Sequence, residues 1–169
     1  MPLLSRLARQ ETVGDMLLAA NARYDEGLSL LDAGYRDGGI YLLGYAAEMI
    51  LKTSFCRVDA TVPPYITVRS RFGIAERHWR QNVISSPLPP GYEHSLRFWE
   101  FVLPLERRAR HKPALGIIVS QTLAGCVGTV ADNWDVKMRY QSSIATAREA
   151  DSVRDAVGWL RDNQRALWS

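Results

Sequence analysis

The segment 38–57 is apolar on nearly all sides of a helix, whereas the other apolar segments show one main stripe each. Its positions form three neighbouring stripes on a helix. The first, with three- and four-residue spacing, is Ile40, Leu43, Ala47, Ile50 and Ser54; the second is Leu42, Ala46 and Met49; the third is Leu51, Phe55 and Val58. A helix that is apolar all round is buried rather than lying on a surface. The pattern therefore predicts that 38–57 is a central helix.

Residues 38–56 contain only two charged side chains, Glu48 and Lys52. Four residues apart on a helix, they lie one turn from each other with the acid in the favoured N-terminal position. A buried charge must be paired or hydrogen-bonded. The sequence leaves two interpretations of the Glu48–Lys52 pair open: it stabilises the fold, or it lies at the base of a polar site. We favour the structural role, because buried ionisable groups mark functional sites only in some proteins.

A single apolar stripe over residues 11–32 predicts a helix that precedes the central one. Gly34 is the expected stop signal of this helix. Asp37 is the expected N-cap of the central helix. The two helices should therefore pack as an antiparallel hairpin across a short turn.

Further helices are expected at 70–84 and 93–112, after a loop at 57–69, and Pro104 should end or kink the second of them. Thr146 and Glu149 have the spacing of a capping box, which opens the last helix. No strand alternation holds over the chain. The predicted fold class is all-α, an up-and-down bundle of five to six helices.

Residues 113–131 carry no charge over nineteen positions, close to the roughly 20 apolar residues that span a membrane. Ser120, Gln121 and several glycines interrupt the segment. We therefore interpret it as a second buried helix, whose glycines allow close backbone approach, and expect no membrane span.

Composition supports one domain over 1–169, with a core at about 11–168, because 47% of the 169 residues are hydrophobic. The two cysteines indicate neither a disulfide framework nor a metal site, and the three histidines are scattered. We expect a cytoplasmic protein with no metal and no cofactor.

The basic residues are concentrated between 57 and 112, where ten Arg or Lys face five Asp or Glu. Such a segment suits an anionic partner such as RNA, DNA or a nucleotide. A solvated surface in an arginine-rich chain accounts for it equally well.

Three patterns in order resemble one known family over roughly residues 15–165. They are an alanine–glutamate–leucine–lysine pattern on the central helix, a tryptophan turn, and the opening of the last helix: Ala47, Glu48, Leu51 and Lys52; Trp134, Arg139 and Tyr140; Ala147–Ala150 leading to Val157–Leu160. The family is HEPN, the higher eukaryotes and prokaryotes nucleotide-binding domains. The resemblance implies a small helical bundle that forms a homodimer and works beside a nucleotidyltransferase in toxin–antitoxin or defence settings.

Some members of this family are metal-independent ribonucleases with an Arg, four to six residues and then a His. Arg71 and His78 have six residues between them, which on a helix is two turns, or about 10.5 Å. His can move the proton of a 2′-hydroxyl, and Arg can hold the phosphate as charge develops. The pair lies mid-chain, whereas the family motif belongs to a later helix, and no histidine follows Arg139.

The sequence therefore favours binding over catalysis: a non-catalytic HEPN-like module for a nucleotide, an RNA or a partner protein. Its expected ligand-binding cluster is Glu48, Lys52, Arg139 and Tyr140, with the Trp134 turn folded over the central helix. The first alternative is the ribonuclease that uses Arg71 and His78. The second is a purely structural protein-interaction module that docks through the basic run 107–112. We interpret His94 as a helix-start residue bonded to a backbone carbonyl.

Overall fold

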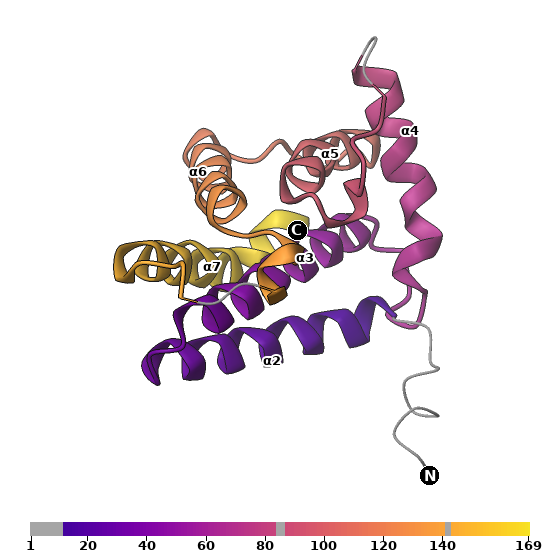
Figure 1. The fold of residues 1–169 in the computed structure, drawn as a ribbon. Helices are drawn as coiled ribbons and strands as arrows, with labels where there is room; N and C mark the ends of the chain where they lie inside the picture. Colours follow the sequence, from indigo (N-terminus) through magenta and orange to yellow (C-terminus); the bar gives the residue numbers. More distant parts are fainter. Residues whose placement is uncertain (1–11, 84–86, 141–142) are drawn as a thin grey trace.

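The computed structural model describes residues 12–83, 87–140 and 143–169, except for the side chains of Arg139 and Tyr140. The described residues form six α-helices and three short 3₁₀ helices (Figure 1): α2 (Val13–Asp32), α3 (Arg36–Val58), η1 (Val68–Arg71), α4 (Phe72–Asn82), η2 (Tyr92–His94), α5 (Leu96–Ala109), α6 (Ile117–Asn133), η3 (Val136–Tyr140) and α7 (Ala147–Trp168). No strand occurs in these residues. The predicted all-α bundle is confirmed.

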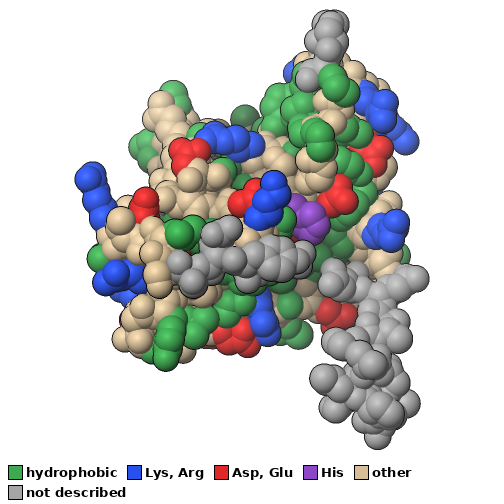
Figure 2. All heavy atoms as spheres, in the orientation of Figure 1, with side chains coloured by type: hydrophobic (Ala, Val, Ile, Leu, Met, Phe, Trp, Pro, Cys, Tyr) green, Lys and Arg blue, Asp and Glu red, His purple; other side chains and the backbone are tan. Residues whose placement is uncertain are grey.

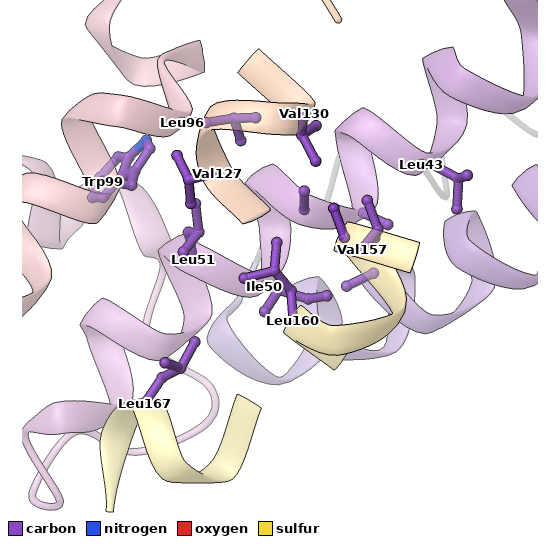
Figure 3. Close-up of a cluster of buried hydrophobic side chains, with 14 of the residues drawn as sticks. Leu43, Ile50, Leu51, Leu96, Trp99, Val127, Val130, Val157, Leu160 and Leu167 are labelled. Atoms are coloured by element: carbon purple, nitrogen blue, oxygen red, sulfur yellow. The ribbon is translucent and has the colours of Figure 1, made fainter. Parts of the chain in front are cut away.

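Helix α3 is the centre of the bundle, as its apolar pattern predicts. Fifteen of its 23 residues are buried, and α2, α5, α6 and α7 all pack against it. In Figure 3, Ile50 lies beside Leu160 of α7, and Leu51 points toward Val127 of α6 and Trp99 of α5. Burial of large apolar side chains on all sides of one helix holds the bundle together, at roughly 1.5–3 kcal/mol for each.

The α2–α3 hairpin forms across the predicted turn. Gly34 has φ +85, a left-handed conformation that glycine adopts without steric cost and that ends α2. The prediction that Asp37 caps α3 is wrong, because Tyr35 is the N-cap and Asp37 lies inside the first turn. The Asp37 carboxylate instead accepts the backbone N–H groups of residues 143–145. It thereby fixes the chain that enters α7 against α3.

The later helices begin and end close to their predicted positions. Thr146 and Glu149 form the predicted capping box of α7. The helix predicted at 93–112 starts at Leu96 and ends at Ala109, and residues 92–94 form η2 instead. Helix α5 continues through Pro104, which is exposed. Water can therefore replace the hydrogen bond that the proline lacks, and the predicted end at this residue is absent.

Helix α6 corrects the prediction of a second buried helix. Only Leu123, Val127 and Val130 are buried, and Ile117 and Ile118 are each 74% exposed. A Cβ added at the glycines of α6 would meet nothing within 4 Å, so these glycines do not serve close packing. Absence of charge suggested burial, yet the small and hydroxyl side chains of this segment tolerate water. Across the described residues, no helix has both the length and the hydropathy to cross a bilayer.

Candidate functional site

The Glu48–Lys52 pair is buried in the middle of α3, as predicted. Lys52 Nζ lies 2.5 Å from Glu48 Oε1, and the two residues are 6% and 4% exposed. The ammonium also lies over the rings of Phe72 and Trp99, 5.5 and 5.7 Å from their centroids. Aromatic faces attract a desolvated cation. The Lys52 charge is thus balanced by one carboxylate and two ring faces.

His94 completes this group from a different element. Its Nδ1 lies 3.2 Å from both carboxylate oxygens of Glu48, and its side chain is 48% exposed. The interpretation of His94 as a residue bonded to a backbone carbonyl is therefore wrong. The η2 turn brings the imidazole to a carboxylate 46 positions away in the sequence. No local pattern reports a contact of that separation.

A cleft opens in front of Lys52, with a volume of about 910 Å³. We call it the Lys52 cleft; it lies between the start of α2, α3, η1, the start of α4 and η2. Its lining is Met16, Lys52, Thr67, Val68, Arg69, Ser70, Phe72, Gly73, Glu76, Tyr92, Glu93 and His94. Its volume is within the range of small-molecule sites, about 300–1,000 Å³. Figure 2 shows a histidine side chain at the surface, with acidic and basic side chains around it.

The charges that line the Lys52 cleft balance each other. Lys52 and Arg69 are cationic, and Glu76 and Glu93 are anionic. The Tyr92 hydroxyl donates to Glu76 Oε1 at 2.5 Å, and burial together with this hydrogen bond raises the pKa of Tyr92 to about 12. The phenol therefore stays a hydrogen-bond donor at neutral pH. The cleft offers donors, acceptors and aromatic surface side by side.

The Trp134 turn folds over α3, as predicted. The Nε1 of Trp134 donates to the carbonyl of Tyr41 at 3.0 Å, and a Cβ added at Gly44 would lie 2.1 Å from the indole ring. Only glycine allows this approach, one helical turn before Glu48. The backbone of η3 carries Arg139 and Tyr140, but their side chains lie outside the described residues, so their predicted roles stay predictions. The described partners of Glu48 are Lys52 and His94.

Arg71 and His78, the predicted catalytic pair, meet on one buried carboxylate. Arg71 Nη2 lies 3.1 Å from Glu106 Oε1, and His78 Nε2 lies 2.7 Å from Glu106 Oε2. Arg110 contacts the same Glu106 at 3.0 Å, and both arginines also contact Asp59. The two members of the pair are each 12% exposed at the side chain. Arg71 and His78 therefore converge on the Glu106 carboxylate, and neither lines the Lys52 cleft.

Glu106 and Asp59 are residues that sequence reasoning missed. Glu106 lies on the apolar stripe of α5, after Trp99, Val102 and Leu103, and an acid on such a stripe is a signal that could have found it. Burial alone would raise the pKa of Asp59. Hydrogen bonds from Thr61 and the charges of Arg110 and Arg71 outweigh it, so this pKa lies below its ordinary value. Each charged group of the network has an oppositely charged partner, although the Nε of Arg71 is buried without a hydrogen-bond partner among the described residues. Such mutual pairing of buried charges is typical of a structural role.

Half of the basic residues between 57 and 112 have partners within the chain. Five of the ten are engaged inside the molecule or in ion pairs: Arg57 on the Trp168 ring, Arg71 and Arg110 in the Glu106 network, Arg97 with Asp132, and Arg107 with backbone carbonyls. These contacts reduce the number of basic side chains that could form a single anion-binding patch. Within the same described residues, no group of three or more His, Cys, Asp or Glu could hold a metal ion.

Comparisons with protein-family models, with curated proteins and with solved structures find no match to this chain.

Proposed function

We propose that this chain is a non-catalytic helical binding module of the HEPN type, and that it binds a nucleotide in the Lys52 cleft. The observation that carries the proposal is the buried ammonium of Lys52 at the edge of the cleft, with half-exposed His94 on the same carboxylate. A buried ion pair gives less stability than apolar packing of the same volume. Polar side chains that converge on a cavity make it a candidate binding site.

The mixed lining of the cleft suits a mononucleotide better than a long RNA. Arg69, Lys52 and the hydroxyls of Thr67 and Ser70 can meet a phosphate. Glu76 and Glu93 can accept hydrogen bonds from ribose hydroxyls or from an exocyclic amine. A polyanion would instead need a net positive groove, because its binding comes from the release of counterions by Lys and Arg.

Thermal unfolding with added AMP tests the proposal. A ligand that binds only the folded state at about one hundred times Kd stabilises it by about 2.7 kcal/mol, and Tm should rise by roughly 5–10 °C. Arg69→Ala should remove most of this rise, and adenosine should produce less of it than AMP. Arg148→Ala is the matched control, because Arg148 is equally an exposed arginine but lies on α7, outside the cleft. A Tm independent of AMP concentration would contradict the proposal.

The proposal extends to protein partners, a second copy of the chain and a nucleotidyltransferase. The feature that supports it is the outer face of α6, where Ile117 and Ile118 are exposed without charged neighbours in the helix. Exposed apolar patches mark interaction surfaces. Sedimentation velocity should show a dimer that Ile118→Glu dissociates and that Ile144→Glu, an exposed isoleucine elsewhere, leaves intact. A monomer at all concentrations would contradict the homodimer.

The second candidate function is the metal-independent ribonuclease, and the observation in its favour is that Arg71 and His78 point to one place. His78 would take the proton of a 2′-hydroxyl, whose oxygen attacks the phosphorus and expels the 5′-oxygen, while Arg71 would hold the phosphate. Glu106 already occupies both groups, so a phosphate would have to displace it. We expect no cleavage of RNA in EDTA. Cleavage that His78→Ala abolishes and His111→Asn preserves would favour this function instead.

A further inference from the structure

A second cleft lies beside the Lys52 cleft and shares His94 with it. We call it the Trp134 cleft; its volume is about 430 Å³ and its lining is Pro90, Gly91, His94, Ser95, Leu96, Arg97, Ala131, Trp134, Asp135, Val136 and Lys137. It is formed by the entry to α5, the end of α6 and the start of η3. Its volume also lies within the range of small-molecule sites.

His94 is the residue that the two clefts share. Its ring is held in place because Nδ1 contacts both oxygens of buried Glu48 at 3.2 Å. Nδ1 is thus engaged, and Nε2 is the ring nitrogen left for a ligand, on a side chain that is 48% exposed. Because Glu48 fixes the His94 ring while about half of the side chain stays exposed, His94 is suited to contact a ligand that occupies both clefts.

We propose that the two clefts bind one ligand, a dinucleotide whose linking phosphodiester crosses His94. This inference rests on the proposed function, because it places the first nucleotide in the Lys52 cleft. The second nucleotide lies in the Trp134 cleft, against Pro90 and the small exposed part of Trp134, which is 7% exposed, with Lys137 and Arg97 also in the lining.

The charges favour a ligand of this size over a polynucleotide. The Lys52 cleft has two cationic and two acidic side chains, and the Trp134 cleft has Arg97 and Lys137 against Asp135. Lys52 is already paired with Glu48, and Arg97 with Asp132, so Arg69 in one cleft and Lys137 in the other are the cations that remain to meet a phosphate. These two cations are sufficient for the single negative charge of a phosphodiester, whereas a long RNA requires several uncompensated cations.

Joining the two nucleotides should increase affinity, because the second one binds as part of the same molecule. The second binding event then occurs at an effective concentration set by the link, not by the solution. We expect adenylyl-(3′→5′)-adenosine to bind at least about ten-fold more tightly than AMP.

Isothermal titration of wild-type protein with AMP and with adenylyl-(3′→5′)-adenosine tests the inference. Lys137→Ala should weaken the dinucleotide by about three- to five-fold and leave AMP unchanged, because an exposed charged contact contributes little more than this. Arg69→Ala should weaken both ligands. Lys112→Ala is the control, since Lys112 lies outside both clefts and the change of charge is the same.

The outcomes separate the two proposals. If AMP binds and the dinucleotide binds no more tightly, or if Lys137→Ala weakens both ligands equally, the inference is wrong and the proposed function stands. If neither ligand binds, both are wrong. Tighter dinucleotide binding with a selective effect of Lys137→Ala supports the two-cleft site.

Discussion

Replacement of Glu48 by alanine should destabilise the fold strongly. The change leaves the Lys52 ammonium, which is 6% exposed, without its carboxylate at 2.5 Å. Breaking a buried pair from one side typically costs about 3–5 kcal/mol. The faces of Phe72 and Trp99 still attract the cation by roughly 0.5–2 kcal/mol, and the expected loss is therefore about 2–4 kcal/mol. For a chain of this length that lowers Tm by roughly 4–16 °C.

Urea unfolding at pH 7, followed by far-UV circular dichroism, measures this loss. The matched control is Glu26→Ala, which removes the acid of an exposed pair, Arg23 with Glu26, whose side chains are 41% and 46% exposed. Such a pair contributes only about 0.2–1 kcal/mol.

A second variant separates burial of charge from loss of packing. Glu48→Gln with Lys52→Met removes both charges together, so no charge is left unpaired and most of the stability should return. If Glu48→Ala unfolds at the same urea concentration as Glu26→Ala, the buried-pair argument fails.

Three further predictions concern other parts of the fold. Asp59→Asn should lower stability more at pH 7 than at pH 3. The folded pKa of Asp59 lies below its ordinary value, so its contribution is fully present above about pH 4 and is lost as pH falls through the folded pKa. Urea unfolding at the two pH values measures this difference, and an equal loss of stability at both would refute it. Arg107→Met should cost about 1–3 kcal/mol, because the carbonyls of residues 113 and 167 lose a buried donor, whereas exposed Arg108→Met should stay within about 0.5 kcal/mol. Burial raises the pKa of Cys56 to about 12, so an aromatic disulfide reagent should label no more than one thiol, that of Cys126, in the folded chain and both in urea; rapid labelling of two native thiols would contradict this.

The local part of the fold could be predicted from the sequence. The all-round apolar pattern of α3 and the four-residue spacing of Glu48 and Lys52 are properties of one helix, and both are confirmed. The α2–α3 hairpin and the capping box of α7 follow from neighbouring residues in the same way. Such contacts span only a few positions, so periodicity and capping chemistry are sufficient to identify them.

The rest of the site depends on contacts between distant segments. Nothing near His94 in the sequence indicates Glu48, and nothing near Arg71 or His78 indicates Glu106, 35 and 28 positions away. Only the family resemblance predicts that the Trp134 turn lies over α3, and no local pattern indicates that Gly44 is the residue that allows its approach. A local pattern indicates which face of a helix is buried, but it does not indicate which distant residue packs against that face.

The error at α6 has a related cause. The absence of charge over residues 113–131 predicts a buried helix, whereas burial requires large apolar side chains on the packed face. Only three of its 17 residues supply that face. Alanine, glycine, serine and threonine cost little in water, so a segment rich in them can be uncharged and exposed.

Amide chemical-shift mapping with AMP tests the central claim most directly, because it locates binding as well as detecting it. In a ¹⁵N–¹H titration the account predicts saturable shifts for the amides of residues 67–76 and 92–94, which border the Lys52 cleft. Shifts concentrated on the outer face of α6, or a spectrum that AMP does not change, would contradict it.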